Sequence, residues 1–309
     1  MPECHSLPLK NLTSVVLAAA VLLLAACQPK GELGSRDNPV RLYFTPSVDA
    51  DTIASNSREF IRFLEQETGD YYVTGIPTSY IAVVEAFGSG RADIGAMNSF
   101  GYLMANERYG ARAHLKMIRH GVDYYQGQIV VRSDSGIETL ADLEGRRFAF
   151  TDPASTSGYF FPLKMLRDAG IRLGNETFAM KHDNVITMVY QGQVDAGSAY
   201  YSAPAADGSI RDARQRVLTQ FPDVEQQVRI LAVTDKIPND PFVFRKDLPD
   251  EIRDRFISAV KKFLASDEGQ DIFRNIYSVE GLVDASDADY DPLREMIRAI
   301  ELDTNRLLL

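Results

Sequence analysis

The chain has 309 residues, of which 45% are hydrophobic and 25% are charged, and its formal net charge is −10. This length suits about two soluble domains, each with a core of its own. No block of lysine and arginine stands out, which excludes a typical nucleic-acid-binding surface, although an acidic protein can still bind an anion where the site itself supplies the donors.

The N-terminal segment has the pattern of a bacterial lipoprotein signal. Lys10 precedes an apolar run over residues 15–26, which is too short to span a bilayer as a helix and is typical of a signal-peptide core. Residues 24–27, LAAC, resemble a lipobox, whose cysteine is lipidated. We therefore predict a signal peptide over residues 1–26 and a lipid on Cys27. The alternative is an ordinary signal peptide with a coincidental cysteine.

The two cysteines of the chain support this interpretation. Cys4 lies in the predicted signal peptide and Cys27 would carry the lipid, so the mature chain would have no thiol and no disulfide. That excludes a cysteine nucleophile and a thiolate zinc site. A lipid without a second apolar segment anchors a chain to a membrane without spanning it. Gln28 favours the outer membrane in a Gram-negative host, because Asp at this position usually signals inner-membrane retention.

The first half of the mature chain alternates strands and helices. Residues 27–38 have no apolar periodicity and are predicted to be a flexible tether. Strands are predicted over residues 40–44 and 71–76, and helices over residues 57–68 and 80–87. Gly69 is a plausible C-cap of the first helix.

A weak internal repeat links the two halves. GRADIGA (residues 90–96) and GQVDAGS (residues 192–198) share the pattern Gly-x-x-Asp-x-Gly after an apolar helix, which puts Asp93 and Asp195 at matching positions. Helix–glycine–strand units recur in any α/β protein, so coincidence is one interpretation. The other is a pair of similar α/β lobes whose corresponding units face each other.

The second half is also α/β. Thr139 and Asp142 resemble a capping box for a short helix. A helical core face repeats from residue 252 to residue 263. Strands are predicted over residues 127–134, 146–150, 228–234 and 241–245. Strands that alternate with helices favour mostly parallel sheets.

The stretch TDPASTSGYFFP, residues 151–162, places three hydroxyls and a glycine between a strand and a helix. Ser or Thr there serves as an N-cap. The functional interpretation is an oxyanion cradle made of hydroxyls and unpaired helix amides. Pro162 cannot donate to a carbonyl four residues back, so the helix should start near Ser157 or Gly158 and leave the N–H groups of residues 157–159 free. Gly158 would let an anion approach the backbone.

The common catalytic motifs are absent from the sequence, which contains no G-x-G-x-x-G, P-loop, H-E-x-x-H or G-x-S-x-G. His114, His120 and His182 have no metal-ligand spacing, so neither a metal nor a cofactor is expected. The chain is therefore not expected to be an enzyme. A lyase or transferase remains the enzyme hypothesis, with His182 and Asp183 as the only candidate bases.

Residues 124–171, together with HDNVITMVYQGQVDAG and IPNDPFVFR further on, closely resemble the phosphate/phosphite/phosphonate-binding proteins of ABC transporters. The segment from DSGI through STSGY is specific to that family. The resemblance implies a two-lobed, type II periplasmic-binding-protein-like α/β fold, with a ligand cleft between lobes that two crossover strands join. We expect lobe 1 to comprise residues 39–128 and 246–309, and lobe 2 to comprise residues 129–245.

The resemblance also implies a set of ligand-binding residues. The hydroxyl-rich turn matches the part of the family that grips the phosphonate, and Asp183 matches an acid that meets the ammonium of amine-bearing phosphonates. The expected ligand-binding residues are Tyr80, Asn98, Ser99, Tyr124, Ser155, Thr156, Ser157, Gly158, His182 and Asp183.

The chain departs from the family at two places. The strand end in lobe 1 reads GAMNSFGY, where many relatives are aromatic and glycine-rich, and it contributes Asn98 and Ser99. The position of a second ammonium-binding acid reads SAPAAD. Both departures favour a small ligand without an amine.

The resemblance implies the lipid-anchored substrate-binding component of an ABC importer. Such a protein would be a monomer that binds phosphonate, phosphite or phosphate and works with a permease and an ATPase. Two alternatives stay open. One is a ligand-binding sensor lipoprotein of the same fold that feeds a signalling partner. The other is a binder of a non-phosphorus organic ligand, such as a thiamine precursor.

Overall fold

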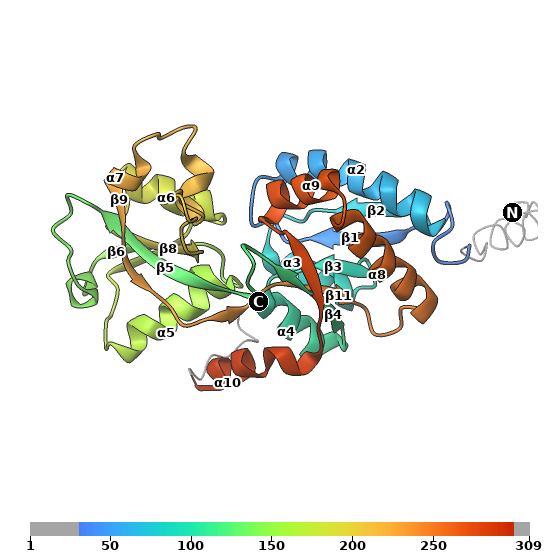
Figure 1. Ribbon diagram of the computed structural model, residues 1–309. Coiled ribbons are helices and arrows are strands. Elements are labelled where there is room, and N and C mark those ends of the chain that lie inside the picture. Colours follow the sequence, from blue (N-terminus) through green and yellow to red (C-terminus); the bar gives the residue numbers. More distant parts are fainter. Residues whose placement is uncertain (1–30, 300–309) are drawn as a thin grey trace, which may run out of the picture.

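The computed structural model describes residues 31–299, and the predicted signal peptide, Cys27 and Gln28 lie outside this range. The described chain forms two α/β lobes, each built on one sheet (Figure 1). Within residues 31–299, no helix combines the length and the apolar character needed to cross a membrane.

Lobe 1 contains a sheet with the strand order β12-β4-β11-β3-β1-β2. Its strands are β1 (Val40–Phe44), β2 (Tyr72–Gly75), β3 (Ile94–Ala96), β4 (Arg112–Ile118), β11 (Pro241–Phe244) and β12 (Gly281–Asp284). Its helices are α2 (Ala50–Thr68), α3 (Tyr80–Gly88), α4 (Ser99–Tyr109), α8 (Asp250–Leu264), α9 (Asp267–Tyr277), the 3₁₀ turn η4 (Asp287–Tyr290) and α10 (Asp291–Ala299).

Two hydrophobic clusters cover the two faces of this sheet. Leu42 and Phe44 of β1 pack with α2, α8 and α9, whereas the intervening Tyr43 packs with α3 and α4 on the other face. Alternation along the strand therefore gives each face its own core. Phe60 lies at the centre of the first cluster, with its ring 4.9 Å from that of Phe273.

Helix α2 is longer than predicted. Gly69 closes it in the left-handed conformation with φ of 76°, which confirms the predicted C-cap. The helix begins at Ala50, because the side chain of Asp49 accepts a hydrogen bond from the backbone N–H of Asp51. Its first turns bury only Ile53, and so few apolar residues give little periodicity in the sequence.

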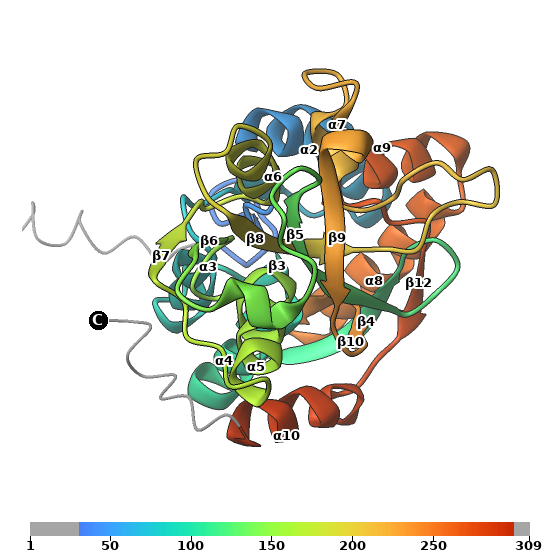
Figure 2. The ribbon, with the colours of Figure 1, turned by 90° about the vertical axis from the view of Figure 1, so that its left-hand side faces the viewer.

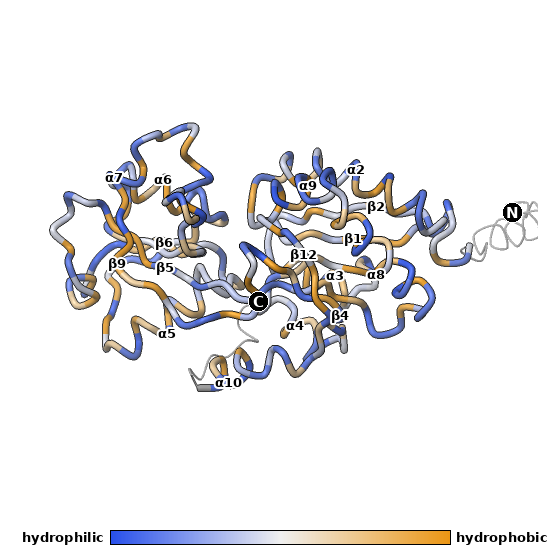
Figure 3. The backbone as a smooth tube through the Cα atoms, in the orientation of Figure 1, coloured by the Kyte–Doolittle hydropathy of each residue, from blue (hydrophilic) through white to orange (hydrophobic). Residues whose placement is uncertain are grey.

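Lobe 2 has the strand order β10-β5-β8-β6-β7, and β9 also pairs with β5, along residues 128–132 (Figure 2). Its strands are β5 (Tyr124–Arg132), β6 (Arg147–Phe150), β7 (Asn175–Phe178), β8 (Ala196–Tyr201), β9 (Val228–Val233) and β10 (Ile237–Pro238). Its helices and turns are η1 (Leu140–Leu143), the π-helical turn η2 (Thr156–Phe160), α5 (Phe161–Asp168), α6 (His182–Tyr190), η3 (Ala213–Val217) and α7 (Val224–Gln227). Hydrophobic residues follow the strands of both lobes (Figure 3).

The internal repeat marks equivalent positions in the two lobes. Asp93 accepts hydrogen bonds from the backbone N–H and the guanidinium of Arg41 on the neighbouring strand β1. Asp195 does the same with Arg147 on β6. The glycines that precede both aspartates, Gly90 and Gly192, have positive φ. The repeat therefore reflects two similar units, as one of the two interpretations predicted.

The sheets are mixed, not mostly parallel. β1 is parallel to β2 and β3, and β6 is parallel to β7 and β8. The strands that connect the lobes enter each sheet in the reverse direction, because β5 is antiparallel to β8 and β11 is antiparallel to β3 and β4. The alternation of strands and helices along the sequence does not reveal this reversal of strand direction.

The lobe boundaries also differ from the predicted ones. Residues 129–245 were assigned to lobe 2, but β11 pairs with β3 and β4 and so belongs to lobe 1. β5 already joins the sheet of lobe 2 at Tyr124, where it pairs with Pro238 of β10. The two crossovers therefore lie near residues 119–123 and 239–240.

Residues 31–38, the described part of the predicted tether, are packed against lobe 1. The Gly34 N–H donates to the Asn38 carbonyl at 2.8 Å, and the Tyr71 N–H donates to the Gly34 carbonyl at 2.7 Å. Leu33 packs against the core. These contacts hold the segment against the lobe, contrary to the predicted flexible tether.

Candidate ligand-binding site

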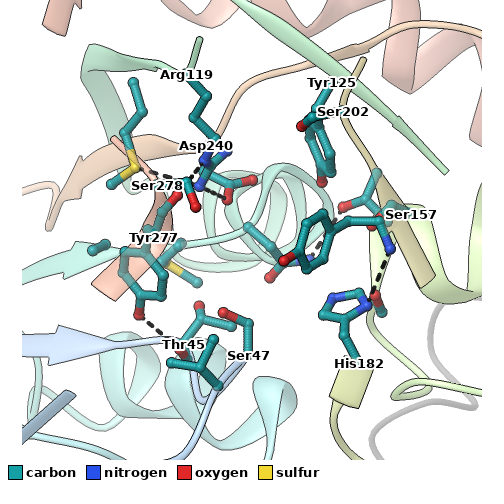
Figure 4. Close-up of a pocket in the computed structure, with 18 of the residues that line it drawn as sticks. Thr45, Ser47, Arg119, Tyr125, Ser157, His182, Ser202, Asp240, Tyr277 and Ser278 are labelled. Carbon is teal, nitrogen blue, oxygen red and sulfur yellow. Dashed lines mark hydrogen bonds and ion pairs between the residues drawn. The ribbon is translucent and has the colours of Figure 1, made fainter. Parts of the chain in front are cut away.

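A cavity lies between the two lobes (Figure 4). Thr45 and Ser47 of lobe 1 and Ser157 and His182 of lobe 2 surround the same space. Its volume is about 70 Å³, and since one water needs roughly 10–15 Å³, it has room for about five non-hydrogen atoms or more. Its walls follow the carboxyl ends of β1, β3, β6 and β8, which is where open α/β sheets bind ligands.

The hydroxyl-rich turn contributes both a cap and unpaired donors. The Ser155 side chain accepts a hydrogen bond from the Gly158 N–H at 3.1 Å, and the Tyr159 N–H donates to the Ser155 carbonyl. The N–H groups of Thr156 and Ser157 have no acceptor within residues 31–299. The cap interpretation thus applies to Ser155. The sequence predicted free N–H groups at residues 157–159, whereas in the structure the free N–H groups are those of Thr156 and Ser157.

Pro162 leaves one carbonyl of this π-helical turn without its helical partner. Because Pro162 has no N–H, the Gly158 carbonyl four residues earlier lacks its helical partner. That carbonyl accepts instead from the Thr151 N–H at 3.1 Å and the Ser198 hydroxyl at 2.7 Å. A Cβ on Gly158 would lie 2.2 Å from Oγ1 of Thr151. The glycine is therefore required by packing against Thr151, and not by the approach of an anion.

Thr156 links the turn to lobe 1. Its hydroxyl oxygen accepts from the Phe100 N–H at 3.0 Å and from Nδ2 of Asn98 at 3.2 Å. Asn98 Nδ2 also donates to the Ala154 carbonyl at 2.8 Å. Since both lone pairs of the Thr156 hydroxyl are used, its proton can be donated to the neighbouring Tyr125 hydroxyl or to a ligand. Phe100 and Phe160 pack across the same junction, with ring centroids 3.8 Å apart.

Tyr80 and His182 occupy equivalent positions in the two lobes. Each is the first residue of a nine-residue helix, α3 or α6, and both line the cavity. The Tyr80 hydroxyl is buried and has no hydrogen-bond partner within the described residues. Burial, and then the Asp152 carboxylate, raise the pKa of Tyr80, so its hydroxyl stays protonated as a donor.

His182 is a neutral donor. Its Nδ1 accepts from the backbone N–H of Tyr200 at 3.3 Å, and because a backbone N–H can only donate, the ring proton lies on Nε2. Burial, followed by the charges of Arg216 and Arg119, lowers the pKa of His182 to about 3. The ring can therefore donate one hydrogen bond in the cavity without adding a charge.

The pKa of His182 predicts a pH dependence of stability. The unfolded chain binds a proton on this ring near its ordinary pKa of 6.5, and the folded chain does so only near 3. Stability should therefore fall as pH drops from about 6.5, by up to about 1.4 kcal/mol per pH unit. We expect His182→Gln to flatten this slope in urea unfolding between pH 7 and 4.5. Parallel slopes for the two proteins would contradict the assignment, because every other titrating group is common to both.

The structure separates the predicted ligand-binding residues into two sets. Those that line the cavity are Tyr80, Asn98, Ser155, Thr156, Ser157 and His182. Those outside the lining are Ser99, Tyr124, Gly158 and Asp183. The Ser99 hydroxyl donates to the Pro238 carbonyl at 2.6 Å, and Asp183 accepts from the N–H of Asn184 in the first turn of α6.

Tyr125, and not Tyr124, is the tyrosine of the crossover that lines the cavity. Successive residues of a strand point to opposite faces, so a shift of one residue changes the side that a ring occupies. The Tyr124 ring contacts Nζ of Lys236, 4.0 Å from the ring centroid. Burial, and then Asp240, raise the pKa of Tyr125, so its hydroxyl also remains protonated.

An ion pair that the sequence did not reveal joins the two crossovers. Arg119 follows β4 and its Nη2 lies 2.7 Å from Oδ2 of Asp240, which precedes β11 (Figure 4). Nη1 of Arg119 donates to Oδ1 of Asn239 and its Nε donates to the Tyr277 carbonyl. Both charged side chains are largely buried and line the cavity. Arg119 is thus neutralised and held on several sides.

Other lining residues were also missed because they belong to no motif. They include Thr45, Ser47, Tyr200, Ser202, Arg211, Arg216, Tyr277 and Ser278. Within residues 31–299, no group of histidine, cysteine and acidic side chains is arranged to hold a metal ion. The polar groups of the lining are mainly hydroxyls, amides and arginines, a set that suits an oxyanion.

Comparison with known proteins identifies the family. The family described as "ABC transporter, phosphonate, periplasmic substrate-binding protein" matches residues 42–290. The Phosphate-import protein PhnD of Mycolicibacterium smegmatis is 24% identical to this chain over 311 residues, covering 90% of this chain and 92% of the relative.

Two solved structures share the type II periplasmic-binding-protein fold. A binding protein component of an ABC phosphonate transporter from Pseudomonas aeruginosa has a TM-score of 0.74 at 18% identity, covering 84% of this chain and 85% of its own. PhnD1 of Prochlorococcus marinus, solved in complex with methylphosphonate, has a TM-score of 0.72 at 17% identity, covering 84% and 97%. The chain therefore belongs to the phosphonate family of periplasmic substrate-binding proteins of ABC transporters.

Proposed function

We propose that this protein is the substrate-binding lipoprotein of an ABC importer that holds a small phosphorus oxyanion between its lobes and delivers it to the permease. One observation carries the proposal. Donors without a partner meet at one cavity: the N–H groups of Thr156 and Ser157 and the hydroxyl of Tyr80. A buried donor without an acceptor costs about 1–3 kcal/mol, so an oxyanion that accepts these bonds would be strongly favoured.

The electrostatics of the cavity support an anion. Asp240 is the only carboxylate among the described residues that line it, and Arg119 neutralises this charge. His182 and Tyr80 stay neutral donors, as their shifted pKa values indicate. A phosphonate, phosphite or phosphate presents several acceptor oxygens and would satisfy these donors together.

The junction between the lobes supports closure around the ligand. Thr156 and Ala154 of lobe 2 accept hydrogen bonds from Phe100 and Asn98 of lobe 1, directly beside the cavity. A ligand bound to the turn would stabilise these contacts, and the permease would recognise the closed form. Such closure is a hinge motion, in which the two crossovers absorb the change of backbone torsion.

A calorimetric screen tests the proposed ligand class. The samples are methylphosphonate, phosphite, phosphate, 2-aminoethylphosphonate and, as a control, sulfate. We expect methylphosphonate or phosphite to bind at least tenfold tighter than 2-aminoethylphosphonate, about 1.4 kcal/mol, because no unpaired carboxylate of the described residues lines the cavity to meet an ammonium. Preference for the amine would contradict the expectation of a ligand without an amine. Failure of every phosphorus oxyanion to bind would refute the proposed function.

Anchoring through Cys27 is a separate part of the proposal. We expect Cys27→Ser to abolish membrane association, because within residues 31–299 no helix is long and apolar enough to cross a membrane. Metabolic labelling with a clickable fatty acid should mark the wild type only. Lipid incorporation into the variant would show that the lipobox assignment is wrong.

A further inference from the structure

Two arginines of lobe 2 line the cavity without an acidic partner. Within residues 31–299, neither Arg211 nor Arg216 forms an ion pair within 4 Å, and Arg211 makes no hydrogen bond, although its charge also acts on the more distant Asp207 carboxylate. Arg216 donates from Nε to the Tyr200 hydroxyl at 3.2 Å. Its Nη groups reach lobe 1 only at 3.3 Å from the Asn275 carbonyl and 3.5 Å from the Ser278 hydroxyl. Both guanidinium groups retain donors for a ligand.

Arg119, the third arginine that lines the cavity, forms an ion pair with a carboxylate. Arg119 has Asp240 at 2.7 Å, and Asp240 is the only lining carboxylate of the described residues. With His182 neutral, neither Arg211 nor Arg216 has a free carboxylate among the described lining residues to pair with. Both arginines are only partly buried, so their charges stay accessible from the cavity, where an anion with matching oxygens can pair with them.

These arginines lie apart from the hydroxyl-rich turn. The contacts of Arg216 are Tyr200, Asn275 and Ser278, and none of them belongs to residues 155–157. The charge of Arg211 acts on His120 at the crossover and lowers its pKa, after the larger effect of burial. The cavity thus has a side with neutral donors at the turn and a side with positive charge at the two arginines, and the charge of Arg216 also acts on His182.

In the proposed function, the phosphorus oxyanion binds at the side of the cavity with neutral donors. Resting on that proposal, we infer that the ligand carries a second anionic group, a carboxylate, that pairs with Arg216 and Arg211. A guanidinium presents parallel N–H donors that match the two oxygens of a carboxylate. The preferred ligands are therefore carboxylated phosphonates.

A pair of nearly isosteric ligands tests this inference. Phosphonoacetate and phosphonoacetamide differ mainly in the charge of the group distal to phosphorus. At pH 7.5 we expect calorimetry on the wild type to show at least tenfold tighter binding of phosphonoacetate. In Arg216→Gln the preference should fall below threefold, because phosphonoacetate should lose clearly more affinity than methylphosphonate does. Because the two ligands are compared in one preparation, partial unfolding of the variant does not affect their ratio.

Control variants separate local pairing from net charge. Arg172→Gln removes an arginine whose side chain is 89% exposed, and it should keep the wild-type preference. Arg216→Lys keeps the charge and should retain most of the preference.

Three outcomes would overturn the inference. Equal affinity of the wild type for phosphonoacetate and phosphonoacetamide would overturn it while leaving the proposed function intact, provided that methylphosphonate binds. An equal loss of methylphosphonate and phosphonoacetate affinity in Arg216→Gln would show that the arginine serves the phosphoryl group itself. Absence of binding by every phosphonate would overturn the proposed function and the inference together.

Discussion

Thr156→Ala or Ser157→Ala should weaken methylphosphonate binding about tenfold to hundredfold. Each change removes a hydroxyl that can donate to a charged acceptor, and hydrogen bonds to charged groups contribute about 1.5–3 kcal/mol. Thr156→Ala should have the larger effect, because its hydroxyl also accepts from Phe100 and Asn98 across the lobe junction. Neither change should abolish binding, since the two backbone N–H groups of the turn remain. Calorimetry on both variants measures these losses.

The controls distinguish ligand contacts from helix capping. Thr156→Ser keeps the hydroxyl and should bind within a few-fold of the wild type. Thr139→Ala removes a cap hydroxyl of η1, distant from the cavity lining, and should cost about 1 kcal/mol of stability without a change in affinity. If Thr156→Ala and Ser157→Ala lowered only the melting temperature and left the dissociation constants unchanged, the turn would be a cap and no more.

Asp240→Ala should lower the free energy of unfolding of the ligand-free protein by about 3–5 kcal/mol. The side chains of Arg119 and Asp240 are only 11% and 18% exposed. Removal of one partner therefore leaves an uncompensated and largely buried charge, which is far more costly than the loss of a surface pair. Urea unfolding followed by circular dichroism measures the change.

Two further variants show whether burial is the cause. Asp284→Asn breaks the pair with Lys261, whose side chains are 84% and 42% exposed, and it should cost less than about 1 kcal/mol. The double variant Arg119→Met/Asp240→Leu removes both charges and should recover much of the loss. A loss below about 1 kcal/mol in Asp240→Ala would contradict the proposed role of this pair in holding the crossovers.

Local sequence signals predicted the parts of the site that lie within one segment. The turn of residues 151–162 could be placed after a strand because hydroxyls, glycine and proline occur at fixed positions around a strand-to-helix connection. The repeat of Asp93 and Asp195 indicated equivalent units. Each aspartate precedes a strand and accepts a hydrogen bond from the backbone N–H of an arginine on the neighbouring strand. Both depend on chemistry within a few residues or between neighbouring strands.

The rest of the site depends on tertiary packing. Arg119 and Asp240 are separated by 121 positions and come together only because two crossovers run side by side. Tyr125 lines the cavity where Tyr124 was predicted to do so, because the pairing of β5 with β10 decides which of the two rings faces the cavity. Asp183 lies one residue beyond His182 on α6, and this step on a helix removes it from the lining. Sequence patterns do not determine such placements to within one residue.

The central claim is that a phosphorus oxyanion binds at the Thr156–Ser157 amides between the two lobes. A crystal structure of the protein with methylphosphonate tests it most directly. We predict that the phosphonate oxygens accept hydrogen bonds from the N–H groups of Thr156 and Ser157, the Tyr80 hydroxyl and Nε2 of His182, within the cavity of Figure 4. Methylphosphonate bound elsewhere, or a cavity that holds only water at saturating ligand, would contradict the account.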